Sequence, residues 1–433
     1  MKRKNEKKAM VGMLIVATMI GTLANPVNIS ANEGGKSKKF TVWAWDANVE
    51  AIQEAAKRYN DATGSNIELD VITVVNEDSR SKLVTIGESQ DYDSLPDFTL
   101  MEDTAIAQFA GTYPEMFVNL TDYDIPWDDL VASKRAMYTV NDSYWAIPMD
   151  SGASIAMYRT DYLEEAGYTL DDLTDVTWEK IIEIGKNVYE KTGHYLLLDT
   201  STSCFIPRQI YTSSGAQFFD ENGAPIFNND VMVKTLELTK ELIDNKVLYM
   251  VGSWDEYNSC MNDGTAAGVI NGNWVNGNVS NAPDQAGLWA VTNIPALDVD
   301  GATHMTNSGG ASWVITSKAG TDTDILVDFL SYELCGEDAQ NFWEYLTEYA
   351  GYSTTYIPVL DSGYQKNISN EYFGDSFYSD IAKSVNGAPA LNASPYYQDA
   401  LDCLMTAVVN VIGGADAAEE AAAAQETLEF NIG

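Results

Sequence analysis

Strand and helix patterns alternate from residue 40 onward, and this alternation limits the chain to few architectures. Residues 40–45 are rich in β-favouring side chains and form the first predicted strand. Residues 47–63 carry apolar side chains at the helical period, and Gly64 stands where such a helix ends. Residues 67–74 and 95–101 return to strand character. This β-α-β-α-β order predicts an α/β fold with an open, mostly parallel sheet and helices on both sides.

A second α/β region follows the first, and 433 residues exceed what one hydrophobic core usually supports. Thr177 is the predicted N-cap of one helix, and residues 231–246 form another amphipathic helix. Residues 219–223 predict a turn through their Asn-Gly pair, because a calcium loop would need later acidic positions that do not fit. The Ala- and Glu-rich residues 415–428 predict a further helix. We therefore expect two domains.

The N-terminus has the pattern of a secretory signal. Residues 2–8 are rich in lysine and arginine, and residues 9–23 are apolar and uncharged. The apolar run is shorter than the roughly 20 residues that a membrane-spanning helix needs. Ala24 and Ala31 are candidate last residues before cleavage. We interpret residues 1–31 as a signal peptide.

The cysteines bear on anchoring and on metal binding. The first cysteine in the chain is Cys204, so none follows the apolar run to carry a lipid anchor. We expect an extracellular or cell-envelope protein without a lipid-modified cysteine. Cys204, Cys260, Cys335 and Cys403 are far apart and form no CxxC pair, which disfavours a zinc site. We expect free thiols, although an exported chain can oxidise them.

Acidic side chains dominate the charge of the chain. Its 64 Asp and Glu residues against 25 Lys and Arg give a formal net charge of −39. Such a surface repels nucleic acid and anionic lipid headgroups. It favours a neutral or cationic ligand over a phosphorylated one, and it also keeps the protein soluble. We expect no nucleic-acid partner.

The motifs that carry most enzyme chemistry are missing from the sequence. The only two histidines, His194 and His304, lie in no metal-binding or nucleophile-activating motif. No glycine-rich phosphate loop of the nucleotide-binding kinds occurs. We therefore expect no cofactor, no metal and no enzymatic activity. The missing motifs do not exclude a glycoside hydrolase, because such enzymes need only two carboxylates across the sugar bond.

Aromatic side chains gather beside glycines and amides near the ends of predicted strands. Trp45 follows the first strand, and residues 271–277 place Trp274 among asparagines and glycines. Residues 307–313 and 352–356 show the same mixture. A sugar ring lays its apolar face on an aromatic ring, while its hydroxyls bond carboxylates, amides and backbone groups. This composition predicts a carbohydrate site outside the carboxyl ends of strands.

Other tryptophans are expected in the core. Trp43 alternates with Trp45 along the first strand, so only one of the two faces the core, and we assign Trp43 to it. Trp313 lies inside a predicted strand and is also assigned to the core. Trp254 and Trp289 fit either environment.

Several segments, taken in order, resemble the extracellular solute-binding proteins of carbohydrate ABC importers, the group that includes maltose-binding protein. The resemblance covers roughly residues 38–430 and rests on the order and spacing of its segments. These segments are residues 40–46, 96–103, 144–150, 155–167, 177–179, 261–274 and 309–312.

The resemblance implies a two-lobed α/β fold of the periplasmic-binding-protein kind, with a hinge and an interlobe cleft. Closure about the hinge would bury the ligand. The expected lobes are residues 38–149 plus 306–352 and residues 150–305 plus 353–433, with crossings at 147–150, 296–308 and 350–357.

The same resemblance implies a monomer that captures a carbohydrate, expected to be an oligosaccharide, and passes it to the membrane subunits of an ABC permease. Trp274 would be the stacking platform. The implied ligand-binding residues are Trp45, Asp46, Glu102, Asp103, Asp150 at the first crossing, Asn273, Trp274, Gly309, Gly310 and Tyr352. Arg208 and Gln209 are further candidates, which a helix start would also explain.

Two other classes of protein remain as alternatives. The first is a carboxylate-pair glycoside hydrolase or polysaccharide lyase, which would turn its sugar over. The second is a binder of peptides or polyamines, which the acidic surface would suit.

Overall fold

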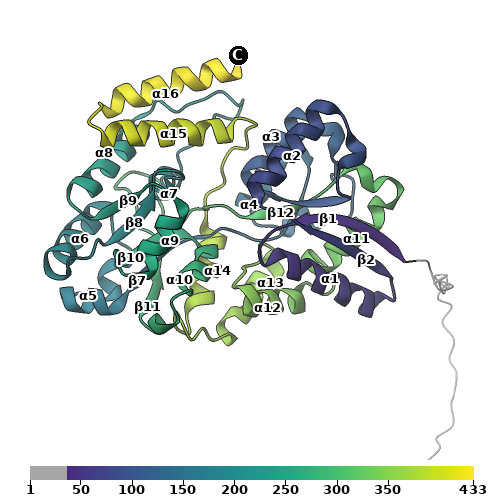
Figure 1. Ribbon diagram of the computed structural model, residues 1–433, viewed down its shortest axis with the longest axis horizontal. Coiled ribbons are helices and arrows are strands. Elements are labelled where there is room, and N and C mark those ends of the chain that lie inside the picture. Colours follow the sequence, from purple (N-terminus) through teal and green to yellow (C-terminus); the bar gives the residue numbers. More distant parts are fainter. Residues whose placement is uncertain (1–36) are drawn as a thin grey trace, which may run out of the picture. The chain divides into compact units, whose positions relative to one another are not determined.

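The computed structural model describes residues 37–433, and it contains two five-stranded sheets flanked by helices (Figure 1). The predicted signal peptide lies outside these described residues. We call the part built on the sheet with the N-terminal strand the first lobe, and the part built on the other sheet the second lobe. The α/β class predicted from the sequence is confirmed.

The first sheet mixes parallel and antiparallel strands. Its strands are β1 (Lys38–Ala44), β2 (Ile67–Thr73), β3 (Phe98–Glu102), β6 (Ile147–Pro148) and β12 (Ala311–Ile315), in the order β2-β1-β3-β12-β6. β1 runs parallel to β2 and β3, whereas β12 is antiparallel to β3 and β6. The prediction of a mostly parallel sheet is therefore wrong at the edge formed by β12 and β6. The reason is that β6 and β12 belong to segments that cross between the lobes and not to β-α-β units.

The second sheet has the same mixture. Its strands are β7 (Ser154–Arg159), β8 (Leu197–Thr200), β9 (Leu248–Val251), β10 (Gly268–Gly272) and β11 (Trp289–Thr292), in the order β11-β7-β10-β8-β9. β8 is parallel to β9 and β10, while β7 is antiparallel to β10 and β11. A short hairpin pairs β4 (Thr139–Val140) with β5 (Ser143–Tyr144).

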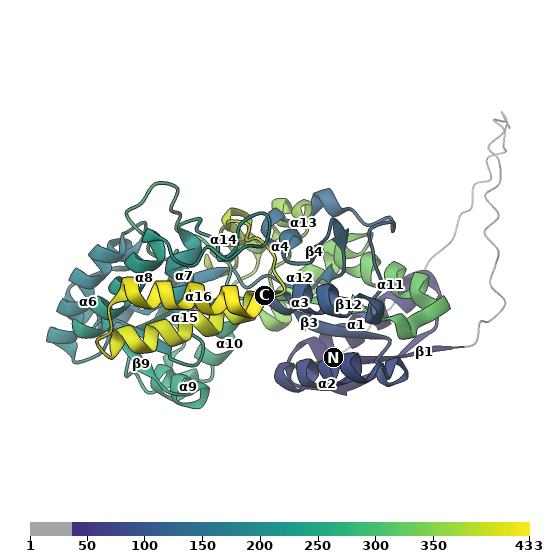
Figure 2. The ribbon, with the colours of Figure 1, turned by 90° about the horizontal axis from the view of Figure 1, so that it is seen from above.

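Helices contribute to the cores of both lobes. α13 (Ile357–Ser362) packs in the cores of both lobes, with Val359 in the first and Leu360 in the second. The other helices of the first lobe are α1 (Asn48–Thr63), α2 (Asn76–Ser89), α3 (Asp103–Thr112), α4 (Ala132–Met137), α11 (Thr323–Cys335) and α12 (Ala339–Ala350). Those of the second are α5 (Thr160–Ala166), α6 (Trp178–Thr192), α7 (Phe205–Ser213), α8 (Asp230–Asp244), α9 (Trp254–Asn262), α10 (Asn276–Val279), α14 (Phe377–Gly387), α15 (Tyr397–Ile412) and α16 (Ala417–Ile432). Figures 1 and 2 show α15 and α16 side by side next to α8.

Local sequence signals set several helix ends and one turn as predicted. α1 ends at Gly64, which adopts the left-handed conformation with φ 73°. The Thr177 side chain caps α6 by accepting a hydrogen bond from the backbone N–H of Lys180. The Asp220 carboxylate accepts hydrogen bonds from the backbone N–H of Asn222 and Ala224, so this segment is the predicted turn.

Alternation along β7 divides the second lobe into two packed layers. Ala156 and Tyr158 join the core that contains α6, while Ile155 and Met157 join the core that contains α14. Successive side chains of a strand point to opposite faces, so helices cover both faces of this sheet.

The tryptophan assignments are settled by burial. Trp43 and Trp313 lie in the core of the first lobe, as predicted. Trp289, which the sequence left undecided, is buried in the second lobe. Trp254 is 36% exposed.

The chain passes between the sheets at two loops, one from β6 to β7 and one from β11 to β12. After α12 the chain contributes to both lobes, because Val359 and Tyr364 pack in the first core whereas Leu360 packs in a core of the second lobe. α14 then packs on β7 and β11 in the second lobe. The exact lobe boundaries stay a prediction.

The described chain contains four free thiols. Cys204, Cys335 and Cys403 are buried, and Cys260 is partly buried. None of the helices within residues 37–433 combines the length and the apolar character that a bilayer crossing requires.

Candidate functional site

The first lobe presents Trp45 and Asp46 directly after β1. Trp45 is partly buried against the first core, and Asp46 is exposed. Asp46 has a positive φ of 49°, which is uncommon for a residue with a side chain. Tyr352 is buried close to this turn, and burial, together with the carboxylates of Asp150 and Asp46, raises its pKa well above the usual range. These three predicted residues therefore share one end of the first lobe with Asp150.

The junction of β3 and α3 carries Glu102 and Asp103, which have different environments. The Glu102 carboxylate is partly buried and accepts a hydrogen bond of 2.9 Å from the side chain of Asn76. Asp103 is buried, and its two oxygens accept hydrogen bonds from Ser312 at 2.7 Å and from Lys134 at 2.6 Å. Burial raises the pKa of Asp103 to about 6, although the Lys134 charge and the Ser312 hydroxyl oppose that rise.

Lys134 is the centre of a buried group that the sequence did not single out. Its ammonium is 1% exposed and also donates to the backbone carbonyls of Asp150 and Ala311. The Asp150 carboxylate accepts the backbone N–H of Ala311 at 2.7 Å, and burial raises its pKa. We call Lys134, Asp103, Asp150, Ala311 and Ser312 the lysine cluster. It ties both crossing segments to α3 and α4.

The predicted stacking residue Trp274 lies after β10, in a short 3-10 helix (Asn273–Val275). Its indole N–H donates to the carbonyl of Ser308 at 2.8 Å, and its ring lies against Gly272 and Gly309. A side chain at Gly272 would collide with the indole, which explains the glycine there. Asn273 is buried, and its side-chain oxygen has no hydrogen-bond partner within the described residues.

Trp274 belongs to a group of three aromatic rings that lie at similar distances from one another. Phe205, the first residue of α7, lies 5.9 Å from Trp274 and 6.2 Å from Trp254 between ring centroids. Trp254 is 5.9 Å from Trp274 and stacks on Tyr257. We call Phe205, Trp254 and Trp274 the aromatic triangle. The sequence analysis left open whether Trp254 lies in the core or at the site, and it did not indicate Phe205. The only sequence feature near Phe205 that pointed to the site was the candidate Arg208.

A pocket lies where both lobes and the second crossing meet. Asp103, Gly309 and Arg208 line it, together with residues that the sequence did not indicate. The full lining is Asp103, Thr104, Ser133, Met137, Arg208, Asn307, Gly309, Pro389, Leu391 and Tyr397. Pro389, Leu391 and Tyr397 are remote in sequence from the other members and follow no recognisable pattern.

Arg208 gives the pocket its positive charge. It is 7% exposed, and one guanidinium N–H donates to the hydroxyl of Ser308 at 2.7 Å. Its Nε has no partner within residues 37–433, and neither has the side-chain oxygen of Asn307. Gln209, the other weaker candidate, is fully buried and bonds the carbonyls of Phe205 and Ile270.

The structure thus gathers the predicted residues into two groups. Asp103 and Asp150 meet in the lysine cluster, and Gly310 packs against it, since a Cβ there would lie 2.8 Å from an Asp103 oxygen. Trp274 and Gly309 meet beside the pocket.

Comparison with known proteins gives one consistent result. Residues 54–370 match the bacterial extracellular solute-binding protein family. The chain is 32% identical over 373 residues to a lactose-binding protein of Rhizobium radiobacter, covering 85% of this chain and 87% of that protein. It is 27% identical over 354 residues to an arabinooligosaccharide-binding protein of Halalkalibacterium halodurans, covering 78% and 77%.

Solved structures share the fold. The GacH receptor of Streptomyces glaucescens, studied unliganded and with acarbose, superposes with a TM-score of 0.74 at 17% identity, over 90% of this chain and 97% of that one. A binding protein of B. animalis subsp. lactis in complex with β-1,6-galactobiose gives 0.71 at 21% identity, over 91% and 97%. With more than half of its length matched, the chain belongs to the bacterial extracellular solute-binding protein family.

Proposed function

We propose that this protein captures a carbohydrate, specifically an oligosaccharide, between its lobes and delivers it to the membrane subunits of an ABC importer. The pocket with its unpartnered polar atoms, beside which Trp274 of the aromatic triangle lies against Gly309, carries this proposal. The relatives named as lactose-binding and arabinooligosaccharide-binding proteins support it.

The chemistry of the pocket suits a sugar. A buried polar atom without a partner costs about 1–3 kcal/mol, and a ligand hydroxyl can serve both as donor and as acceptor. The Nε–H of Arg208 offers a donor and the side-chain oxygen of Asn307 an acceptor. The Trp274 ring beside them offers the flat apolar surface on which a pyranose packs.

The second crossing has the features of a hinge. Ser308 is bonded to Trp274 and Arg208 of the second lobe, and Ala311 is bonded to Asp150 and Lys134. Between them, Gly309 and Gly310 adopt positive φ values of 104° and 111°. Two consecutive glycines let the backbone rotate where a side chain would not. We place the hinge there, between lobes of residues 38–149 plus 306–352 and 150–305 plus 353–433, with residues 357–364 in contact with the cores of both lobes.

The lysine cluster argues against hydrolysis of the sugar. A general acid needs a free carboxyl oxygen within reach of the glycosidic bond. The raised pKa of Asp103 would suit such an acid, but its two oxygens are already bonded to Ser312 and Lys134. We infer that the protein binds its sugar without turnover.

Location and partners follow from the family. Its members are extracellular solute-binding proteins. We propose that the chain is exported by its signal peptide, acts as a monomer and meets its permease at the membrane surface.

Titration of the mature protein with a panel of oligosaccharides tests the proposal. Tryptophan fluorescence and calorimetry would follow lactose, β-1,6-galactobiose and arabino-, malto- and xylo-oligosaccharides. We expect saturable binding to at least one series. Trp274→Ala should weaken it by about tenfold or more, because a stacked ring contributes about 1 kcal/mol beyond its buried area.

Phe430→Ala is the matched control, since this ring is 85% exposed near the end of α16. It should leave sugar binding unchanged. No binding by the whole panel, with binding of spermidine or peptides instead, would support the second alternative. Appearance of shortened sugars during the titration would support a glycosidase.

A further inference from the structure

The helix α7, which carries Phe205 and Arg208, begins in an unusual way. Cys204 stands at its N-cap position, where Ser, Thr, Asn or Asp usually accepts a backbone N–H. Cys204 instead has a positive φ of 46° and makes no capping hydrogen bond with its side chain. Such a backbone conformation costs free energy and persists only where surrounding contacts hold it. Another group must therefore fix the start of α7.

The carboxylate of Asp199, near the end of β8, is that group. One of its oxygens accepts the backbone N–H of Phe205 at 3.1 Å, and the other accepts the backbone N–H of Ile206 at 2.8 Å. Pro207 has no N–H, and the N–H of Arg208 makes the regular helical bond at 3.1 Å. The two donors that an N-cap residue would normally serve are therefore both held by Asp199.

Asp199 also lies close to the residues that support the aromatic triangle. It is fully buried and accepts a third hydrogen bond, from the backbone N–H of Thr200 at 2.7 Å. α7 and α9 both pack on β8, the strand of Asp199 (Figure 1). Burial raises the pKa of Tyr257, on which Trp254 stacks, and the Asp199 charge adds to the rise. The carboxylate is thus near the backbone of one ring of the triangle and the support of another.

The first turn of α7 carries one residue of the triangle and one of the pocket. Phe205 belongs to the triangle, and Arg208 lines the pocket three residues later. Residues at this spacing share one face of a helix, and the Arg208 guanidinium lies 5.7 Å from the centre of the Phe205 ring. A displacement of this turn would therefore move the ring and the guanidinium together.

We propose that Asp199 is a positioning residue, which fixes the first turn of α7 through the backbone N–H of Phe205 and Ile206 and so holds Phe205 and Arg208 in place for the sugar. Asp199 itself contacts no ligand, because it is fully buried and its hydrogen bonds go to the backbone. The inference rests on the proposed function, and it adds a residue that sets the affinity for sugar without touching it.

The charge of Asp199 makes this positioning depend on pH. Burial raises the pKa of Asp199 to about 7, although its three backbone hydrogen bonds and the Arg208 charge oppose the rise. A proton would sit on an oxygen that already faces a backbone N–H, so it weakens that bond and removes the favourable negative charge at the helix N-terminus. Sugar binding, which needs the ordered turn, should therefore weaken as pH falls below about 7.

The other groups around Asp199 keep their charge in this range. The charged or titratable side chains that face it are Arg208 of α7, Tyr257 of α9 and Cys204. Burial raises the pKa of both Tyr257 and Cys204, so these two stay neutral near pH 7, and arginine stays charged. A pH effect that acts through this group of residues therefore belongs to Asp199.

Calorimetric titration of the wild type and of Asp199→Asn tests the proposal, with the oligosaccharide that binds best in the panel. An asparagine keeps one acceptor oxygen and turns the other position into a donor that faces a backbone N–H. Between about pH 8 and pH 6 we expect the wild-type affinity to fall about three- to tenfold. Asp199→Asn should bind about tenfold or more weakly than the wild type at pH 8 and change less than about twofold over the same range. Wild-type affinity in folded Asp199→Asn, or the same pH dependence in both proteins, would overturn the inference.

Asp416→Asn is the matched control. The exposed carboxylate of Asp416 caps α16 by accepting the backbone N–H of Ala418 and Glu419, both at 3.0 Å. This helix contributes no residue to the pocket or to the aromatic triangle. The substitution should leave the sugar affinity and its pH dependence unchanged, and thermal unfolding would show that both variants are folded. An equal loss of affinity in both variants would mean that weakening any helix cap is sufficient, and it would overturn the special role of Asp199.

Hydrogen exchange in the sugar-free protein separates this inference from the proposed function. The backbone amides of Phe205 and Ile206 should lose protection as pH falls below about 7 in the wild type, and they should be weakly protected at every pH in Asp199→Asn. Sugar binding together with unchanged protection in Asp199→Asn would overturn the inference and leave the proposed function standing. Absence of wild-type binding to every sugar of the panel would overturn both.

Discussion

The lysine cluster and the aromatic triangle both contact the same crossing segment, and their polar neighbours differ in whether they have hydrogen-bond partners. In the cluster, the ammonium of Lys134 uses its three donors on Asp103, Asp150 and Ala311. Beside the triangle, the Nε of Arg208 and the side-chain oxygen of Asn273 have no hydrogen-bond partner within residues 37–433. A satisfied buried network holds a structure in one arrangement, whereas unpartnered groups are available to a ligand.

This difference separates positioning residues from ligand-contacting residues, which the sequence analysis had placed together as ligand-binding residues. Asp103 and Asp150 were predicted to contact sugar. Their side-chain oxygens instead accept hydrogen bonds from Lys134 and Ser312, in the case of Asp103, and from the backbone N–H of Ala311, in the case of Asp150. Trp274 has a partly exposed ring and one internal hydrogen bond. We infer that the cluster positions the crossing segments, and that the second lobe and the crossing supply most of the free surface for the ligand.

Removal of the Lys134 charge should have the largest effect. Lys134→Met leaves Asp103 buried without its cation, and breaking a buried ion pair costs about 3–5 kcal/mol. We expect a loss of that order in the free energy of unfolding, measured by urea denaturation. Adding Asp103→Asn to Lys134→Met should restore part of the loss, because the two groups are directly coupled.

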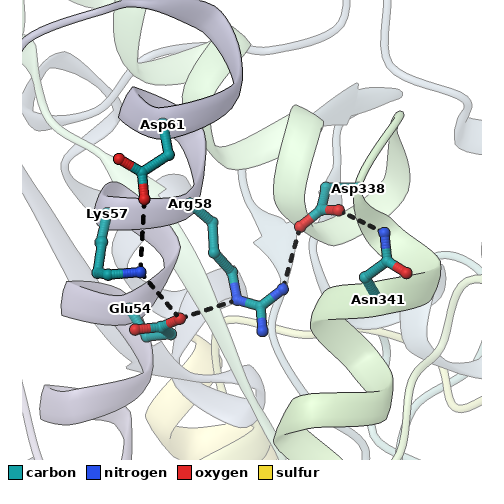
Figure 3. A network of polar contacts seen from close by, with 6 residues as sticks. All are labelled: Glu54, Lys57, Arg58, Asp61, Asp338 and Asn341. Carbon is teal, nitrogen blue, oxygen red and sulfur yellow. Dashed lines mark hydrogen bonds and ion pairs between the residues drawn. The ribbon is translucent and has the colours of Figure 1, made fainter. Parts of the chain in front are cut away.

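Lys57→Met is the matched control. Lys57 lies on the surface of α1, 3.4 Å from Asp61 and 3.9 Å from Glu54 (Figure 3). Exposed pairs of this kind contribute about 0–1 kcal/mol. If Lys134→Met cost no more than Lys57→Met, the cluster would not hold the crossings, and Asp103 would return to the candidates for sugar contact.

Glu333 is a buried carboxyl that, unlike Asp103, has no lysine bonded to it, and its pKa is raised further. It lies on α11, is 1% exposed, and neither of its oxygens has a hydrogen-bond partner within residues 37–433. Arg58, the nearby cation, is bonded to Glu54 at 3.1 Å and Asp338 at 3.4 Å (Figure 3). Burial raises the pKa of Glu333 to about 8; the Asp338 carboxylate adds to the rise and Arg58 opposes it.

The pH dependence of stability tests this difference. In the unfolded chain the Glu333 carboxyl has its ordinary pKa of 4.5 and loses its proton near that pH, whereas in the folded chain its pKa is raised to about 8 and it keeps the proton to about that pH. The folded state therefore binds more protons in this window, so stability falls as pH rises, by up to about 1.4 kcal/mol per pH unit. Glu333→Gln should remove this contribution and become increasingly more stable than the wild type from pH 5 to about 8.

Urea denaturation of the wild type and of Glu333→Gln at several pH values would measure how the difference in their free energies of unfolding changes with pH. The comparison between them removes the parallel contribution of Asp103, whose raised pKa is unchanged by the substitution. A constant difference between the two proteins across this pH range would show that Glu333 is already ionised when folded.

Local patterns predicted the parts of the fold that depend on neighbours in sequence. Gly64 and Thr177 end and begin their helices as expected, because capping involves residues within one turn. The direction of β12 and β6 was missed, since pairing across a lobe crossing leaves no local periodicity.

At the candidate site, too, the sequence indicated only residues with a distinctive local pattern. Trp274 stood out because glycines and asparagines surround it in sequence. Lys134 did not, since nothing in its neighbourhood distinguishes a buried lysine from the surface lysines of an amphipathic helix. Pro389 and Leu391, in the coil between α14 and α15, reach the pocket only through the tertiary path of the chain. Residues that act through long-range contacts need coordinates to be found.

The smallest effect is expected at Trp254, the most exposed ring of the aromatic triangle. Trp254 is partly exposed, so Trp254→Ala should cost less than about 1 kcal/mol of stability and weaken binding of tri- and longer oligosaccharides by about three- to tenfold. Disaccharide affinity should change less than about twofold, because Trp254 is the most exposed of the three rings and we expect it to contact only the further units of a longer ligand. Calorimetry with a series of increasing chain length measures this split, with Phe430→Ala as the exposed-ring control. An equal loss for disaccharides would mean that Trp254 acts by supporting Trp274, from which it lies 5.9 Å away. The aromatic triangle would then resemble the lysine cluster, as a group that positions one contact residue, and only Trp274 and Arg208 would still distinguish the two regions.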